Sequence, residues 1–181
     1  MRILDLVLSS AGLACMLPAL GLIGVAIRLD SRGGAVFAQE RVGRGGRTFR
    51  MYKFRTMREG VGGPHFTARG DPRITRVGRV LRRTSLDELP QLVNVLLGDM
   101  ALVGPRPEVP AQRADYTAEE WSERHLVRPG LTGLAQVSCR SQGNPARRKQ
   151  LDLEYVRRRT VWLDIMTLAR TVRQLAAEGS F

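Results

Sequence analysis

The segment RRTSLDELPQLVNVLLGDMALVGPRPE, residues 82–108, is the most informative part of this chain. Two adjacent carboxylates, Asp87 and Glu88, follow the arginines Arg82 and Arg83 and precede the rigid step Pro105-Arg106-Pro107. A carboxylate can hold a metal ion or attack phosphorus, while guanidinium groups neutralise phosphoryl oxygens. The segment therefore indicates chemistry on a phosphate.

The same residues also have a purely structural interpretation, as the start of a helix. Ser85 and Glu88 have the spacing of a capping box, and acidic residues favour the first turn of a helix. Pro90 conflicts with a continuous helix from Ser85, because it lacks a backbone N–H. The helix must kink there, or begin again at Pro90 and run to Leu97 with Gly98 as its stop.

Length, charge and cysteine content limit which class of protein this is and which partners it is expected to bind. The chain has 181 residues, the length of one domain, and a net charge of +12 with a sequence pI of about 11.3. Such a charge favours acidic partners: nucleic acid, anionic lipid or a phosphorylated substrate. Cys15 and Cys139 form neither a disulfide framework nor a metal-ligand spacing, which is compatible with a reducing compartment.

The N-terminal segment, residues 3–29, is almost entirely apolar and long enough to span a bilayer. A cleaved signal peptide fits poorly, because only Arg2 precedes the run and no small-x-small site follows it. Pro18 divides the run into two parts that are each too short to cross alone. A helix broken at Pro18 would keep Arg2 and Arg28 on the cytoplasmic side, so the residues leave a re-entrant and a spanning helix both open.

Two apolar runs, residues 36–42 and 48–54, flank the turn Gly43-Arg44-Gly45-Gly46 and predict a β-hairpin. Lys53, near the end of the second run, could simply be a solvated cation on an edge strand. Residues 58–73 are rich in glycine and proline and predict a loop.

Helical patterns follow the loop. Arg76, Arg79 and Arg83 share one face of a predicted basic amphipathic helix suited to a membrane surface. Thr117 and Glu120 form a second capping box, which predicts a short helix towards His125. Residues 131–138 alternate loosely and predict a strand.

A final helix is predicted at about residues 160–177. Its apolar residues fall within one arc, with Arg170, Thr171 and Gln174 opposite. Such a stripe usually packs into a core; the alternative is an interfacial helix with Trp162 at the depth of the lipid headgroups. The stripe consists of Val161, Trp162, Ile165, Leu168, Ala169, Val172, Leu175 and Ala176.

Taken in order, these motifs resemble the bacterial sugar transferases, the monotopic phosphoglycosyl transferases that load a sugar 1-phosphate onto polyprenol phosphate. The resemblance rests on SLDELPQL at residues 85–92, GDM at 98–100, VGPRP at 103–107 and RPGLTG at 128–133, and it covers nearly the whole chain. The chain departs from the family at Leu134, where a tryptophan is usual, and at Ser138-Cys139, where Asn-Gly is usual. If that loop contacts sugar or nucleotide, the departures would alter substrate choice.

The resemblance implies a small single α/β domain with a short β-hairpin and amphipathic interfacial helices. It also implies a re-entrant membrane helix broken at Pro18. Residues 1–30 would form this anchor, continuous with a cytosolic catalytic domain at residues 31–181. The protein would then lie on the cytoplasmic face of a bacterial inner membrane.

The implied reaction moves a sugar 1-phosphate from a UDP-sugar to polyprenol (undecaprenyl) phosphate and releases UMP, as the first membrane step of glycoconjugate or polysaccharide synthesis. Asp87 would attack phosphorus and form an aspartyl-phosphosugar, with Glu88 assisting and Mg²⁺ bridging Asp87 and the pyrophosphate. The substrate phosphates or nucleotide would be bound by Lys53, Arg82 and the step Pro105-Arg106-Pro107.

The expected partners are the UDP-sugar, polyprenol phosphate and anionic membrane lipid, and a homodimer is compatible with the sequence. Nucleic acid is not expected, because the chain lacks an aromatic stacking platform, zinc spacing or a recognition-helix signature. A non-catalytic basic membrane-surface or nucleic-acid-binding protein would explain the charge, but not the Asp87-Glu88 pair between arginines. A structural subunit of the cell envelope would explain the N-terminal anchor and little else.

Overall fold

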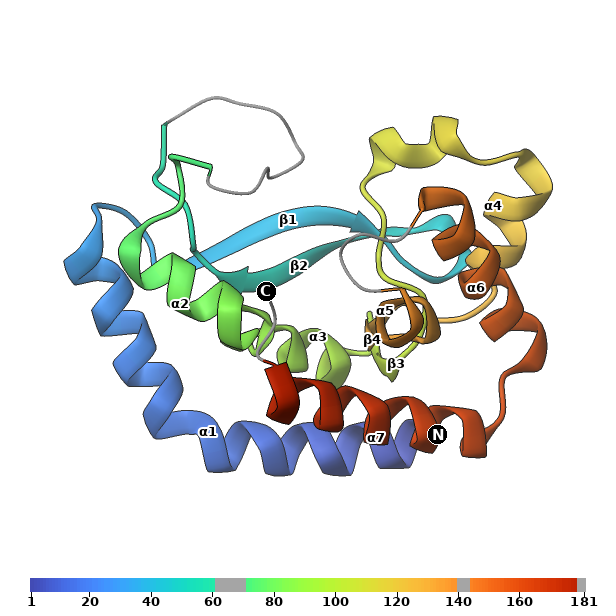
Figure 1. The fold of residues 1–181 in the computed structure, drawn as a ribbon, viewed down its shortest axis with the longest axis horizontal. Helices are drawn as coiled ribbons and strands as arrows, with labels where there is room; N and C mark the ends of the chain where they lie inside the picture. The colour runs from blue at the N-terminus through green and yellow to red at the C-terminus, as the bar shows by residue number, and fades with distance from the viewer. Residues whose placement is uncertain (61–70, 140–143, 179–181) are drawn as a thin grey trace.

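The computed structural model describes residues 1–60, 71–139 and 144–178, and shows a mixed helix and sheet protein. Figure 1 shows the long helix α1 (Arg2–Asp30) along the lower edge, with the β-hairpin above it and α7 (Val161–Glu178) beside its N-terminal part. Part of the predicted loop, residues 61–70, lies outside the described residues. The mixed fold class is confirmed.

Helix α1 is not interrupted at Pro18 but bends sharply along its length in Figure 1. A proline inside a helix removes one hydrogen bond and crowds the preceding turn, which is sufficient cause for a bend. The predicted break is therefore a bend within one continuous helix. Of the described residues, only this helix is long and apolar enough to cross a membrane, and 6% of its most apolar stretch is buried within the molecule.

The predicted hairpin is confirmed with the predicted bounds. Strands β1 (Val36–Val42) and β2 (Thr48–Phe54) pair antiparallel around a short turn, η1 (Arg44–Gly46). Gly45 and Gly46 both have positive φ angles, 69° and 76°, which a residue with a side chain rarely adopts. The glycine pair therefore allows the tight reversal between the strands.

The restart of the helix at Pro90 is confirmed. Helix α2 (Arg76–Thr84) is followed by the short turn η2 (Leu86–Glu88) and then α3 (Gln91–Leu97), which ends at Gly98 in the left-handed region. The capping-box interpretation of Ser85 is wrong. Ser85 has a φ of 54° and ends α2. Its side chain makes no capping hydrogen bond to the turn η2 that follows.

A second sheet pairs β3 (Ala101–Val103) parallel to β4 (Gly130–Thr132). The predicted strand at residues 131–138 is wrong beyond Thr132, because α5 (Leu134–Ser138) follows at once. Gly133 lies so close to the backbone of Gly104 that a Cβ atom there would meet the Gly104 carbonyl oxygen at 2.2 Å. The chain leaves the sheet at this close contact, and the intrinsic helix propensity of Leu134 and Ala135 then prevails.

The remaining helices form the other end of the molecule (Figure 1). They are η3 (Pro110–Asp115), α4 (Ala118–Arg124) and α6 (Pro145–Arg158). The capping box at Thr117 and Glu120 is confirmed, with both reciprocal hydrogen bonds present.

Helix α7 forms where predicted, but apart from Leu168, which packs against the core, its apolar stripe is exposed. Trp162 is 69% exposed and Val172 is 67% exposed. The inward face carries polar residues beside Leu163 and Leu168. Asp164 accepts a hydrogen bond from Tyr155 Oη at 2.6 Å, and Gln174 donates to the Val137 carbonyl at 2.8 Å. The core-packing prediction is therefore wrong for every stripe residue except Leu168, because hydrogen-bonded polar residues occupy most of the inward face.

Both ends of α1 are attached to the globular part. Arg2 donates to the last carbonyls of α3, including that of Leu96 at 2.8 Å, and buried Asp5 accepts from the Leu102 N–H at 3.1 Å. At the other end, Asp30 accepts from the Val77 N–H at 2.9 Å. The core itself is formed by two clusters, Met51, Leu92, Val95, Met100, Leu102, Val103 and Tyr155, and Ile27, Phe54 and Leu81.

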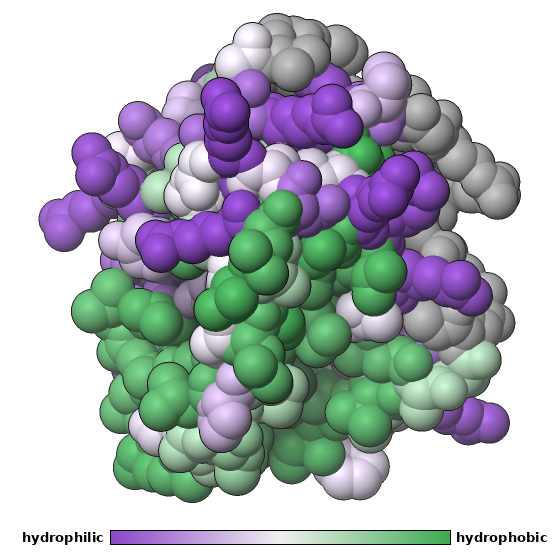
Figure 2. Space-filling model, turned by 90° about the vertical axis from the view of Figure 1, so that its left-hand side faces the viewer, coloured by the Kyte–Doolittle hydropathy of each residue, from purple (hydrophilic) through white to green (hydrophobic). Residues whose placement is uncertain are grey.

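The surface is divided into an apolar and a polar half. Figure 2 shows hydrophobic side chains over the lower part of the molecule, where α1 lies, and hydrophilic ones above. The exposed large apolar residues of α1 include Ile3, Val7, Leu17, Leu22 and Val25. A continuous apolar surface of this kind marks a site of contact with membrane or protein.

Candidate active site

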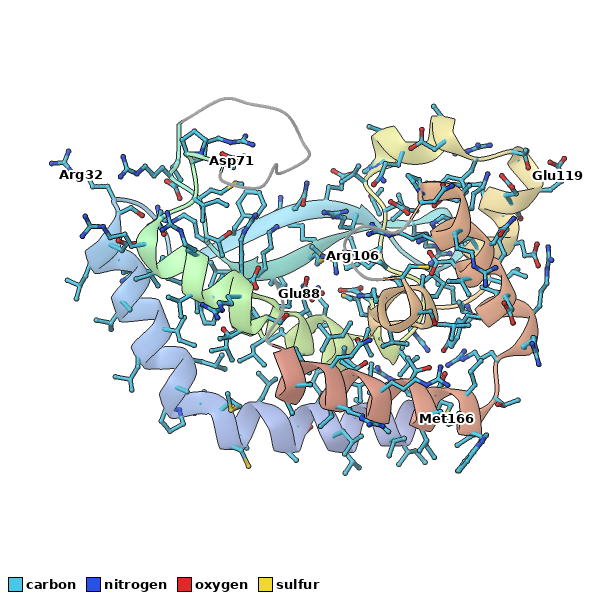
Figure 3. The ribbon with its side chains drawn as sticks, viewed as in Figure 1. Arg32, Asp71, Glu88, Arg106, Glu119 and Met166 are labelled. Atoms are coloured by element: carbon cyan, nitrogen blue, oxygen red, sulfur yellow. The ribbon has the colours of Figure 1, made fainter. Side chains whose placement is uncertain are left out.

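The turn η2 brings the two adjacent carboxylates beneath the hairpin. Figure 3 shows Glu88, from the junction of α2 and α3, and Arg106, from the segment after β3, close together near the middle of the molecule. Glu88 Oε1 accepts from Arg106 Nη2 at 2.8 Å. The left-handed Ser85 ends α2 and Pro90 opens α3, so the carboxylates sit in a sharp corner between two helices.

Asp87 is the buried carboxylate of the pair, with 9% of its surface exposed. Burial, and then the negative charge of Glu88, raises the pKa of Asp87 to about 6, against the opposing charges of Lys53 and Arg82. Removal of a carboxylate from water penalises its charged form, and a like charge nearby adds to that penalty. A perturbed carboxylate among cations is typical of a functional site.

Four cations surround this carboxylate pair. Burial, and then the charges of Arg106, Arg41 and Arg82, lowers the pKa of Lys53. Arg82 is directed towards the segment after β2 by a hydrogen bond from its Nε to Thr56 Oγ1 at 2.9 Å. A group of like charges is costly by itself, so the arrangement suits an anionic ligand that would relieve the repulsion.

Arg41 is the member of this group that the sequence analysis missed. It lies on β1, and its Nη1 donates to the Pro107 carbonyl at 2.9 Å. The hairpin register pairs Phe37 with Lys53, and side chains two residues apart on a strand share a face. Arg41 therefore lies on the same face as Lys53, and strand alternation was the signal that could have identified it.

The other predicted site residues have different surroundings. Arg83 is exposed on α2, whereas Arg82 is partly buried. Pro18 belongs to α1, in the apolar part of the molecule. Leu134, one of the departures from the family pattern, packs against the first core cluster.

The carboxylates could bind Mg²⁺ together with a substrate. Within the described ranges there is no cluster of three or more His, Cys, Asp or Glu side chains, so the protein would supply one or two carboxylate oxygens. Mg²⁺ prefers oxygen ligands and is often bound by one or two carboxylates plus substrate phosphates and water. Asp87, with Glu88 beside it, fits that requirement.

Comparison with known proteins shows the family to which the chain is similar. Residues 1–178 match the family model described as bacterial sugar transferase. The chain is 44% identical to an undecaprenyl-phosphate glucose phosphotransferase of Komagataeibacter xylinus, with 99% of this chain and 36% of that protein covered. It is 45% identical to a UDP-glucose:undecaprenyl-phosphate glucose-1-phosphate transferase of Caulobacter vibrioides, with 96% of this chain and 68% of that protein covered.

Relatives with a different named sugar are almost as similar. The chain is 39% identical to a UDP-N-acetylgalactosamine-undecaprenyl-phosphate N-acetylgalactosaminephosphotransferase of Aeromonas hydrophila, with 96% of this chain and 43% of that protein covered. The chain therefore spans between about a third and two thirds of the length of these curated relatives. Sequence identity does not separate the sugars.

Proposed function

Because the chain belongs to the bacterial sugar transferase family, we propose that it transfers a sugar 1-phosphate from a UDP-sugar to undecaprenyl phosphate and releases UMP. The names of the Komagataeibacter and Caulobacter relatives support this substrate pair. The observation that carries the proposal is the buried carboxylate Asp87, placed beside Glu88 and among four cations. Such a site combines a nucleophile with the positive charge that a diphosphate requires.

The proposed chemistry has two displacements. A carboxylate oxygen of Asp87 forms a bond to the sugar-linked phosphorus while the bond from that phosphorus to the bridging oxygen breaks, and UMP leaves. A phosphate oxygen of undecaprenyl phosphate then attacks the same phosphorus and releases the Asp87 carboxylate. Covalent catalysis of this kind divides one difficult step between two anions into two easier ones.

The cations have separate parts in this proposal. Lys53 and Arg82 are the cations whose charges oppose the pKa shift of Asp87, so they are near enough to shield an incoming phosphate. Arg106 is half-exposed, with 52% of its side chain accessible, and can turn from Glu88 to a ligand. Mg²⁺, when bound at Asp87, would add positive charge on the diphosphate oxygens.

We also propose that α1 is a re-entrant membrane helix at the cytoplasmic face of the bacterial inner membrane. A straight helix of 29 residues would be about 43 Å long and would place its ends on opposite sides of a bilayer. Here Arg2 binds α3 and Asp30 binds the start of α2, so one globular body holds both ends. The exposed apolar stripe of α7 supports a second contact with the membrane surface.

The test of the activity is UMP release from a panel of UDP-sugars in the presence of undecaprenyl phosphate and Mg²⁺. At least one UDP-sugar should support release that stops when Mg²⁺ is chelated. No release with any of them would favour a non-catalytic basic membrane-surface protein.

The test of the intermediate uses UDP-sugar labelled in the sugar, incubated with the enzyme and Mg²⁺ but without lipid. Label should remain covalently bound in proportion to UMP. Asp87→Asn should retain no label and lose at least about 10³-fold in rate. Asp115→Asn is the matched control, because Asp115 is exposed on η3. If both substrates must be present before any UMP appears, transfer is direct and Asp87 is not the nucleophile.

A further inference from the structure

All three carbonyl groups of the Pro105-Arg106-Pro107 step accept hydrogen bonds from other segments. The first accepts from the Gly130 N–H at 2.9 Å, the second from Arg124 Nη2 at 2.7 Å and the third from Arg41 Nη1 at 2.9 Å. The two prolines have no N–H to donate, so the carbonyls are the main polar groups by which this step can be held. Two of the three donors are guanidinium groups.

Arg124 is held in place behind the step. Only 2% of its surface is exposed, and it forms ion pairs with Asp152 at 2.7 Å and with Glu108 at 3.2 Å. Tyr116 donates to the same Glu108 oxygen at 2.8 Å. A buried cation with two carboxylates has little freedom, so its bond to the Arg106 carbonyl has a defined direction.

Arg41 holds the other side of the step from β1. Its second guanidinium nitrogen, Nη2, donates to Gln39 Oε1 at 2.8 Å, which fixes the orientation of the guanidinium group. Burial, and then the charge of Arg106, lowers the pKa of Arg41 to about 10. Two guanidinium groups near one another repel, so stability alone does not account for placing Arg41 here.

We propose that Arg41 and Arg124 are positioning residues that hold the Pro105-Arg106-Pro107 step by its carbonyls and so direct the Arg106 guanidinium at the diphosphate of the substrate. The inference rests on the proposed function. The Arg106 side chain is half-exposed and pairs with Glu88, so its reach depends on how its backbone is fixed. Fixing the backbone in advance lowers the entropy lost when Arg106 grips a phosphate.

The test is a double-mutant cycle of Arg41→Met and Arg106→Met in the full chain. Arg41 is the better choice, because replacing Arg124 would leave two buried carboxylates unpaired and could prevent folding. The rate of UMP release and the dissociation constant for UDP-glucose are measured for all four proteins. Arg41→Met should lower kcat/KM for UDP-glucose by about 10- to 100-fold, because small misplacements of a binding group are costly. In the Arg106→Met background the same change should cost less than about threefold.

Arg47→Met is the control, because Arg47 lies on the same hairpin and is exposed. This substitution removes the same charge as Arg41→Met. It should leave kcat/KM within about twofold. Arg41→Lys should restore part of the loss, since one donor could still reach the Pro107 carbonyl. The apparent KM for undecaprenyl phosphate should not change in Arg41→Met.

The outcomes separate this inference from the proposed function. If the wild type releases UMP but the two substitutions reduce the rate independently, the positioning role is overturned. If the two substitutions are coupled in UDP-glucose binding while the wild type releases no UMP with any UDP-sugar, the positioning role is supported and the proposed function fails. The thermal midpoint of each variant, measured in the same detergent, shows that it is folded.

Discussion

At the scale of single residues, the adjacent carboxylates differ because their surroundings differ. Asp87 is buried and its pKa is raised to about 6, whereas Glu88 is paired with Arg106 at 2.8 Å. Neighbouring carboxylates with different environments can take different roles in one reaction. The paired acids of the sequence thus become one buried group, suited to be a nucleophile, and one more accessible group that pairs with Arg106.

The pKa of Asp87 predicts the pH dependence of the proposed reaction. A nucleophilic carboxylate must be ionised, so kcat/KM for the UDP-sugar should fall about tenfold per pH unit below about pH 6. In Glu88→Gln this fall should begin at a lower pH than in the wild type, because the charge of Glu88 helps to raise the pKa of Asp87. Initial rates between pH 4.5 and about 8 test this. A profile that stays flat to pH 5 would contradict the assignment of Asp87.

The neighbouring arginines Arg82 and Arg83 form a matched pair for mutation. Arg82 donates to Thr56 Oγ1 at 2.9 Å and lies within the electrostatic reach of Asp87, while Arg83 is exposed. Arg82→Ala should lower kcat/KM by about 10²-fold, because a preorganised charge at the phosphates is lost. Arg83→Ala should stay within about threefold. Equal effects in steady-state rates would mean that the charge of α2 as a whole matters, rather than the position of Arg82.

At the scale of elements, the sequence predicted where a helix forms better than it predicted which face of the helix is buried. Helix α7 was predicted correctly in position and wrongly in orientation, because its inward face carries buried Asp164 and Thr167. Their hydrogen bonds, such as Tyr155 Oη to Asp164, would be lost if the apolar stripe turned inward. Apart from Leu168, the stripe is therefore left on the surface, where a bilayer can cover it.

Asp5 attaches helix α1 to the second sheet, so we expect its side chain to contribute to the stability of the folded protein. Asp5→Ala would leave the buried N–H of Leu102 without its acceptor, a cost of about 1–3 kcal/mol. The thermal midpoint in detergent should fall by roughly 3–10 °C for a chain of this length. Asp5→Asn keeps an acceptor oxygen and should lose much less. If both variants unfold at the wild-type temperature, α1 is attached by its apolar contacts alone.

At the scale of the whole molecule, charge and apolar surface are separated. The apolar half shown in Figure 2 covers the part of the molecule where α1 lies, and the hairpin lies on the other side of α1 in Figure 1. The cations of the candidate site come from that hairpin, from α2 and from the segment after β3. A molecule divided in this way would rest on a membrane with its reacting groups near the polar surface. An isoprenoid phosphate and a soluble nucleotide could then meet at one site.

The proposed re-entrant topology predicts labelling from one side of the membrane only. A cysteine added before Met1 and a cysteine at Arg32 are compared in sealed vesicles, with Cys15 and Cys139 replaced. A membrane-impermeant reagent should reach both from the same side, because one globular body holds both ends of α1. Pro18→Leu should shift part of the population to opposite-side labelling, since it restores a straight apolar helix. Opposite-side labelling of the unaltered helix would mean that α1 spans the membrane.

Local patterns were sufficient for the elements whose formation depends on neighbouring residues. The glycine pair at 45–46 allows the turn of the hairpin, and the missing N–H of Pro90 determines where α3 begins. Thr117 and Glu120 determine where α4 begins. In each case the determining force acts over a few residues, through φ angles, lost donors or capping hydrogen bonds.

Only the tertiary structure decided which side chains meet. Ser85 ends α2 instead of capping a helix, Arg41 joins the site through the Pro107 carbonyl, and the stripe of α7 faces outward. Each of these outcomes depends on partners far away in sequence, and buried polar groups must be satisfied before apolar ones are covered. The sequence could therefore name the carboxylates and most of the cations of the candidate site, but not the carbonyl contacts that hold Arg106 in place.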